Sequence, residues 1–330
     1  MSRPGGGPVV ALVGATGVLG REMLEVLGAR MPGIAELRCR AGERSLGAEV
    51  EFRGDPVSVD EGIPGPADLR GVDLAILCAP PEVSREAARA ALHARVPCID
   101  CSGALAGEGD VPLLGPGILA GGKVPPGPAL AVPPGPVLAL ATAALPLREA
   151  AGLEGLAAAV LEPASAAGRE AVDRLSIESI ALFNQAELEE GPAPEAAAVA
   201  FDCAPLGDER AEAAAGRLLA RALGDEVPSH IERIRVPTFH GTGAVVSVST
   251  GRSLDPEAAA GVLAAAPGLE VIAGAAPGTR GIAGSERVRV ARIRADASRP
   301  RGLAFWLVAD ALRLAAVFAA RAAEARLAGD

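Results

Sequence analysis

The chain has 330 residues, of which 50% are hydrophobic but only 2% aromatic, with no Tyr and one Trp. This length favours two domains, and the composition requires a core built from Ala, Val, Leu and Ile. The formal net charge of −10, with Lys123 as the one lysine, argues against a nucleic-acid partner, because phosphate binding needs clustered Lys and Arg.

The first 130 residues alternate strand and helix patterns. We expect a strand at 8–13, a helix at 21–29, a strand at 36–40, a hairpin-like stretch at 49–59, a strand at 73–79, a helix at 83–94 and a strand at 96–100. This alternation predicts a parallel, doubly wound Rossmann-like sheet.

A glycine-rich turn, Gly14-Ala15-Thr16-Gly17-Val18-Leu19-Gly20, joins the first strand to the first helix. This geometry points backbone N–H groups and a helix N-terminus at a phosphate, and glycine lets the phosphate approach the backbone closely. The pattern favours a nucleotide-binding ancestry, with a tight turn of some other α/β protein as the alternative.

Beyond a proline-rich passage at 124–136, the patterns predict an α+β domain with a mostly antiparallel sheet. We expect helices at 138–149, 169–180, 209–223, 256–265 and 302–327, and strands at 156–161, 231–236, 244–250 and 286–293. The predicted domains are residues 1–132 with the C-terminal helix 302–330, and residues 133–301.

The five cysteines predict no metal site. Cys98 and Cys101 are three residues apart, but Cys78 and Cys203 have neither a partner at such a spacing nor a neighbouring histidine. Cys78 and Cys98 fall in apolar strand runs, and Cys101 follows a strand end without an identifiable base. Reduced thiols in a cytoplasmic protein are the expected state.

Neither a signal peptide nor a membrane span is expected. The first eight residues contain no apolar stretch of the right length. Residues 124–147 carry no charge but contain seven prolines, and the C-terminal apolar run is interrupted by Asp310, Arg313 and Arg321. No membrane partner is therefore predicted.

A resemblance covers nearly the whole chain. It is carried by the opening VALVGATGVLGREMLEVL, ERSLG at 43–47, DLAILCAPPEVS at 73–84, VPCIDCSGAL at 96–105, DVPLLGPGI at 110–118, VLALATAALPL at 137–147, SAAG at 165–168, FDCAPLG at 201–207 and RVPTFHGTGAVV at 235–246. In this order and spacing the chain resembles the aspartate-semialdehyde dehydrogenase family of amino-acid biosynthesis. The resemblance implies NADP-dependent interconversion of an acyl phosphate and an aldehyde through a cysteine thioester.

The positions that carry this chemistry in the family are substituted here. The nucleophilic cysteine aligns with Gly135 and the histidine with Thr242, which cannot move protons near neutral pH as imidazole does. The family's glutamine aligns with Glu162, which places a negative charge where an anionic substrate would sit. The phosphate-holding arginine aligns with Ala106.

Two residues remain as candidates for the substrate side. Arg235 is retained in kind and would hold the substrate carboxylate, or else form a surface ion pair. His240 lies two residues from Thr242 and could substitute for the missing histidine, although a packing role beside Phe239 is the simpler interpretation.

The positions that would contact the cofactor are partly retained and partly substituted. The resemblance assigns NADP contacts to Gly14, Thr16, Gly17, Val18, Leu19, Arg44, Ser45 and Ala79, with the Arg44-Ser45 pair receiving the 2′-phosphate. Pro80 and Pro81 replace a Gly-Gly pair, which removes two N–H donors. Trp306, aligned with an asparagine that reaches the cofactor, is expected to obstruct the pocket or fill the core.

Our leading hypothesis from the sequence is a non-catalytic member of this family, a pseudoenzyme that forms a homodimer. It would bind a nucleotide or a small acidic ligand, with NADP binding weak or lost and no metal. One alternative is an NAD(P)-dependent oxidoreductase that acts on a small acidic semialdehyde by non-covalent chemistry, with His240 or Glu162 transferring the proton. The other is a structural or regulatory partner of an active paralogue.

Overall fold

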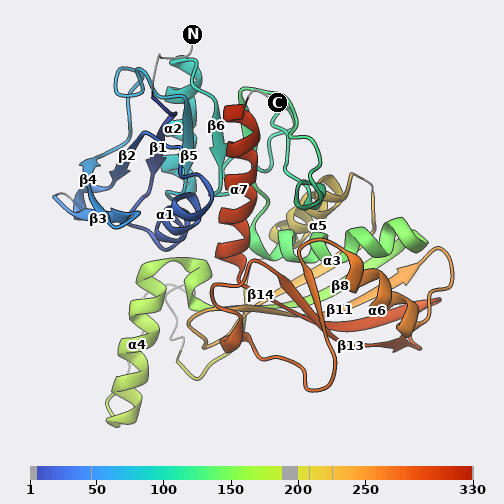
Figure 1. The fold of residues 1–330 in the computed structure, drawn as a ribbon. Coiled ribbons are helices and arrows are strands. Elements are labelled where there is room, and N and C mark those ends of the chain that lie inside the picture. The colour runs from blue at the N-terminus through green and yellow to red at the C-terminus, as the bar shows by residue number, and fades with distance from the viewer. Residues whose placement is uncertain (1–5, 46, 188–199, 208, 225, 329–330) are drawn as a thin grey trace. The chain divides into compact units, whose positions relative to one another are not determined.

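The computed structural model describes residues 6–45, 47–187, 200–207, 209–224 and 226–328 (Figure 1). The chain forms two compact units, Met1–Leu138 together with Leu312–Asp330, and Ala139–Ala311. The domain boundaries that the sequence indicates, at 132/133 and 301/302, stay a prediction. Each unit contains one seven-stranded sheet.

The sheet of the first unit is the parallel, doubly wound sheet that the sequence predicts. Its strands lie in the order β3 (Glu49–Phe52), β4 (Asp55–Glu61), β2 (Glu36–Ala41), β1 (Val9–Val13), β5 (Leu74–Leu77), β6 (Cys98–Asp100) and β7 (Ala129–Ala131). Neighbouring strands pair in parallel except β3 and β4, which form the predicted hairpin. All residues of β1 and β5 are buried, as expected for central parallel strands covered on both faces.

Helices α1 (Val18–Arg30) and α2 (Pro81–His93) connect the parallel strands, and α7 (Ala311–Ala328) returns to this unit. The shorter elements are the 3₁₀ turns η1 (Glu43–Ser45) and η2 (Pro116–Ala120). Arg313 of α7 pairs with Glu22 of α1 at 2.8 Å, and Arg326 donates to the carbonyls of Gly127 and Pro125. The alanine-rich face of α7 is almost fully buried, so this helix is part of the core of the first unit.

The second unit contains a mixed sheet. Its strands lie in the order β12 (Leu269–Ile272), β13 (Val288–Asp296), β14 (Gly302–Ala309), β11 (Thr242–Thr250), β8 (Leu153–Glu162), β10 (Ser229–Arg235) and β9 (Ala204–Pro205). The β12–β13 and β8–β10 pairs are parallel, and the other four neighbouring pairs are antiparallel. The remaining elements are α3 (Gly135–Ala151), η3 (Ala164–Ala167), α4 (Arg169–Phe183), α5 (Glu209–Leu223), α6 (Pro256–Ala265) and η5 (Thr279–Ile282).

The prediction of one long helix from residue 302 to 327 is wrong. Gly302–Ala309 is strand β14, in the middle of the second sheet, and the helix begins at Ala311. Six of the eight residues of β14 are buried, so the strand shows a nearly continuous apolar run without the alternation that distinguishes a strand from a helix.

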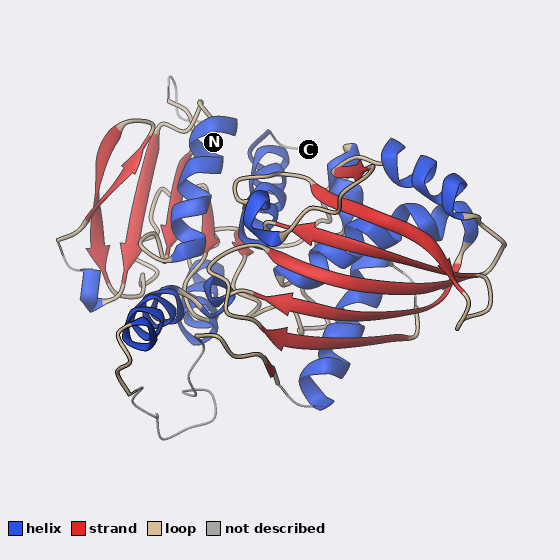
Figure 2. Cartoon of the chain, turned by 90° about the horizontal axis from the view of Figure 1, so that it is seen from below, coloured by secondary structure: helices blue, strands red, loops and turns tan. Residues whose placement is uncertain are grey.

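The second sheet is the large group of red strands on the right of Figure 2, and the side chains of its two faces differ in exposure. Even-numbered residues in the middle of β8 and β11 are buried, whereas Ala157 and Ala159 are half-buried and Val245 is 50% exposed. Residues two apart in a strand share a face, so one face of this sheet is covered and the other is left open. No helix in the described residues is long and apolar enough to cross a membrane.

Candidate functional site

The glycine-rich turn is packed too tightly for larger residues. Gly14 has φ +89°, and a Cβ added to it would lie 2.5 Å from the backbone nitrogen of Ala79. A Cβ on Gly20 would lie 2.0 Å from the carbonyl oxygen of Gly14. These two glycines therefore bring the end of β1, the start of α1 and the end of β5 into direct backbone contact.

The turn uses some of its donors and leaves others available. The N–H groups of Gly14 and Ala15 donate to the carbonyl of Arg40. Gly17 caps α1 without a side-chain hydrogen bond, so the first-turn N–H groups of Val18 and Leu19 have no partner within the helix. Unpaired donors at a helix N-terminus attract an anion.

Ser45, which the sequence predicts to contact the cofactor, lies beside the glycine-rich turn. Its Oγ is 2.9 Å from Oγ1 of Thr16, which links η1 to the glycine-rich turn. The side chain of Arg44, predicted to share this role, lies outside the described part of the chain. The first unit thus brings together the backbone of the turn, Thr16, Ser45 and Ala79.

Pro80 and Pro81 begin α2 beside the turn. Pro80 is the N-cap and Pro81 the first helical residue, and the carbonyl of Ala79 accepts a hydrogen bond from Ser84 Oγ. Proline suits this position in a helix because the first N–H has no partner there. It supplies no donor, so α2 offers an anion fewer N–H groups than α1 does.

The loop after β6 is organised by Asp100, which is fully buried. Its carboxylate accepts hydrogen bonds from the backbone N–H and the Oγ of Ser102 and from the N–H of Leu105. Burial raises the pKa of Asp100, and these hydrogen bonds oppose the rise. The loop leads to Ala106, which is 1% exposed and brings no positive charge.

Arg85 was missed by sequence reasoning. Its Nη2 donates to the carbonyl of Ala104 at 2.7 Å, so a guanidinium from α2 reaches the loop that lacks the family's arginine. The contact joins residues 19 apart, and no local motif indicates it.

Gly135 is the first residue of α3. A cysteine at a helix N-terminus has a lowered pKa and is therefore a good nucleophile. The local geometry suits a thiolate, but glycine has no side chain to supply one.

In the second unit, Glu162 is held by an ion pair. Glu162 ends β8 and is 2% exposed, and both of its carboxylate oxygens bind Arg233, through Nε and through Nη2 at 2.9 Å. The hydrogen bond to Glu162 raises the pKa of Arg233. The sequence suggests a bare negative charge at Glu162; in the structure Arg233 neutralises it.

Arg235 and Thr242 flank Glu162 on either side of β8. Arg235 pairs with Glu162 in register, and Gly243, the residue after Thr242, pairs with Leu161. Arg235 Nε, Thr242 Oγ1 and Thr238 Oγ1 are buried and have no hydrogen-bond partner among the described residues. Buried polar atoms of this kind require an explanation, such as an ordered water or a bound ligand.

His240 and Trp306 occupy different environments. His240 is exposed in the loop between β10 and β11. Trp306 lies within β14, donates from Nε1 to the carbonyl of Pro277 at 2.8 Å, and packs over Gly243. These contacts hold the half-buried indole against β11, on the face of the sheet that also carries the exposed Val245.

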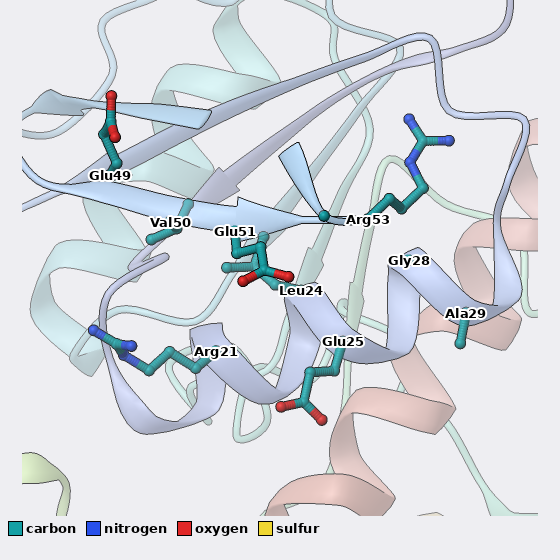
Figure 3. A pocket seen from close by; sticks show the side chains of 10 residues that line it. Arg21, Leu24, Glu25, Gly28, Ala29, Glu49, Val50, Glu51 and Arg53 are labelled. Carbon is teal, nitrogen blue, oxygen red and sulfur yellow. The ribbon is translucent and has the colours of Figure 1, made fainter. Parts of the chain in front are cut away.

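One groove of the first unit lies away from these residues. Its volume is about 820 Å³, and it lies between α1 and the edge strand β3, with charged side chains such as Arg21, Glu25 and Glu51 along it (Figure 3). It includes none of the predicted site residues. Among the described residues no cluster of three or more His, Cys, Asp or Glu could hold a metal ion.

Comparison with known proteins accounts for both units. Residues 9–120 match the model described as "Semialdehyde dehydrogenase, NAD binding domain", and residues 145–314 match "Semialdehyde dehydrogenase, dimerisation domain". The chain belongs to the semialdehyde dehydrogenase family. Aspartate-semialdehyde dehydrogenase 2 of Vibrio cholerae is 30% identical over 316 residues, which cover 92% of this chain and 93% of that protein.

Solved structures of the family share the fold. Aspartate-semialdehyde dehydrogenase II of Vibrio cholerae, crystallised in complex with ASA, superposes with a TM-score of 0.87 at 29% identity, covering 98% of this chain and 99% of that chain. The Candida albicans enzyme with NADP has a TM-score of 0.72 at 15% identity, covering 97% and 99%. At that identity the second likeness concerns the fold alone.

Proposed function

We propose that this semialdehyde dehydrogenase family member binds a small anion and a nicotinamide nucleotide but does not catalyse phosphate-dependent semialdehyde oxidation. The observation that carries the proposal is Gly135 at the start of α3, where the resemblance places the nucleophilic cysteine. A thioester cannot form without a thiol. Thr242, at the histidine position, cannot exchange protons near neutral pH as imidazole does.

Arg235, Thr238 and Thr242 support the anion-binding part of the proposal. Each has a buried polar atom without a partner in the described chain, and all three side chains can donate hydrogen bonds. A carboxylate accepts such bonds, and a guanidinium adds charge to them. The Glu162–Arg233 pair removes the repulsion that an unpaired carboxylate at 162 would exert.

The glycine-rich turn supports the nucleotide-binding part. Val18 and Leu19 offer backbone donors to a pyrophosphate, and the close packing at Gly14 and Gly20 holds the start of α1 against the ends of β1 and β5. A bound nicotinamide would supply hydride transfer. The prolines that open α2 reduce the number of donors, so we expect weaker binding than a Gly-Gly pair would give.

The alternative of a non-covalent oxidoreductase is weakened at one of its two proton-transfer candidates. Both carboxylate oxygens of Glu162 are bound to Arg233, which leaves this group unsuited to exchange protons with a substrate. His240 remains the candidate for that alternative.

Activity and binding measurements test the proposal together. The purified protein is incubated with aspartate semialdehyde, NADP and phosphate, and absorbance at 340 nm is followed; no turnover is expected. Thermal shifts with malonate and with NADP should each be positive, because a ligand that binds the native state raises the unfolding midpoint. Arg235→Met should remove the malonate shift, whereas the exposed control Arg294→Met should keep it. Turnover by the wild-type protein that is lost on a single substitution refutes the proposal.

The open face of the second sheet supports a homodimer. In register, Val245 lies between Ala159 and Trp306, which forms a row of exposed or half-buried apolar side chains across three central strands. We expect Val245→Arg to convert a dimer to a monomer in light scattering. Leu92→Arg, at a 40% exposed position of α2, is the matched control and should leave the dimer intact.

A further inference from the structure

Two thiols meet at the carboxyl edge of the first sheet. The parallel strands β5 and β6 pair with Leu77 opposite Asp100, so the next residues, Cys78 and Cys101, lie opposite each other. The N–H of Cys101 donates to the carbonyl of Leu77 at 2.9 Å, and the N–H of Cys78 donates to that of Val13 at 2.8 Å. Both residues therefore continue the hydrogen-bonded ladder, and the Cys78 side chain is close enough to raise the pKa of Cys101.

The other cysteines have no such neighbour in the described chain. Cys39 and Cys98 are buried, and desolvation raises the pKa of each to about 12. Cys203 is exposed. Cys98 is three residues before Cys101 in an extended segment, and an odd separation places the two side chains on opposite faces. The partner of Cys101 is thus on the neighbouring strand.

We propose that Cys78 and Cys101 are a redox modification site that closes to an intramolecular disulfide. Adjacent strands lie about 4.8 Å apart. This spacing falls within the Cα separation of about 4.4–6.8 Å that disulfides show. Strand register therefore predicts a Cα separation for the two residues that is compatible with a disulfide.

A low-molecular-weight disulfide such as oxidised glutathione is the oxidant. One cysteine thiolate attacks it, forming a mixed disulfide and releasing one glutathione; the second thiolate then attacks the mixed disulfide and releases the other. The cysteine pair loses two electrons and two protons, which leave in the two glutathione thiols. The neighbouring Cys78 thiol and burial raise the pKa of Cys101, so the reaction should accelerate as pH rises.

The disulfide would form directly beside the glycine-rich turn. A Cβ on Gly14 would lie 2.6 Å from the carbonyl carbon of Cys78, so the turn rests on the backbone of this residue. Oxidation would therefore tie together the ends of β5 and β6 at the point where β5 supports the turn.

Alkylation and mass spectrometry test the proposal in a Cys203→Ser background, which removes the exposed thiol. The native full-length protein is incubated with oxidised glutathione at pH 8.5, denatured and alkylated with N-ethylmaleimide. We expect four adducts before oxidation and two afterwards, and a non-reduced digest should link the peptides of Cys78 and Cys101. Cys98→Ala, the control on the same strand, should still form the disulfide, whereas Cys78→Ser and Cys101→Ser should each prevent it.

Four adducts after prolonged oxidation would overturn the proposal. A disulfide that links Cys98 to Cys101, or one that forms only in urea, would overturn it equally. The digest of the otherwise unchanged protein gives the answer even where a serine variant fails to fold.

Discussion

Replacing Arg233 by Met should destabilise the protein far more than replacing Glu162 by Gln, although both changes break the same ion pair. The Glu162 side chain is 3% exposed and that of Arg233 is 35% exposed. Arg233→Met leaves the Glu162 carboxylate buried and without its partner. Glu162→Gln leaves a guanidinium that water can reach and an amide oxygen that can still accept its hydrogen bond.

The expected magnitudes follow from this asymmetry. Removing one partner of a buried pair costs about 3–5 kcal/mol, and the partial exposure of Arg233 places Arg233→Met near the lower end. Glu162→Gln exchanges a charged hydrogen bond for a neutral one and should cost about 1 kcal/mol. For the unit of residues 139–311, these values correspond to losses of about 6–12 °C and 2–4 °C in midpoint.

Calorimetry at pH 8 and pH 5 measures both effects. In Arg233→Met the unpaired Glu162 carboxyl should have a folded-state pKa above its unfolded value. The folded state of the variant then binds more protons than its unfolded state. The loss in free energy of unfolding is therefore full at pH 8 and becomes smaller as pH falls through the raised pKa. Arg294→Met, at an exposed arginine of β13, is the control and should cost less than about 0.5 kcal/mol.

Equal losses for the two variants would refute the reasoning, because burial of the carboxylate would then not decide the cost. A loss in Arg233→Met that stays the same at both pH values would refute it as well.

Two further predictions concern other parts of the chain. Gly14→Ala should lower the free energy of unfolding by about 2–4 kcal/mol, because its Cβ would overlap the backbone of Ala79 at a positive φ. Gly33→Ala, with nothing within 4 Å of the added Cβ, is the control and should be nearly neutral. Urea unfolding measures both. The hydrogen bond from Ser247, together with those from Ser298, lowers the pKa of Asp296 to about 2. This folded-state pKa lies below the unfolded value of about 3.9, so the stabilisation is present above pH 4 and is lost as pH falls towards 2. Thermal midpoints of Asp296→Asn should therefore vary less with pH over that interval than those of the wild type; an unchanged pH profile would contradict this assignment.

Local signals predicted most elements closely. Helix α6 begins and ends at the predicted residues, Pro256 and Ala265, because proline suits the first turn and the Asp255 carboxylate caps the helix by accepting from Ala258. Strand β14 was assigned to a helix because its burial removes the alternation on which such predictions depend.

The contacts that define the candidate site could not be predicted in the same way. Glu162 and Arg233 are 71 residues apart, and the sequence alone showed a charge without its partner. Cys101 meets Cys78 rather than the nearer Cys98, because strand register decides the pairing. Sequence identifies the residue types at family positions, whereas their electrostatic state depends on neighbours that only the fold supplies.

Trp306 makes the protein its own optical probe. It is the sole tryptophan of a chain without tyrosine, so emission excited at 295 nm arises from one indole. That indole packs over Gly243 and donates to Pro277, all within residues 139–311. Fluorescence therefore reports on one unit while far-ultraviolet dichroism reports on both. The separation between the two unfolding curves would measure directly how strongly the halves of the molecule cooperate.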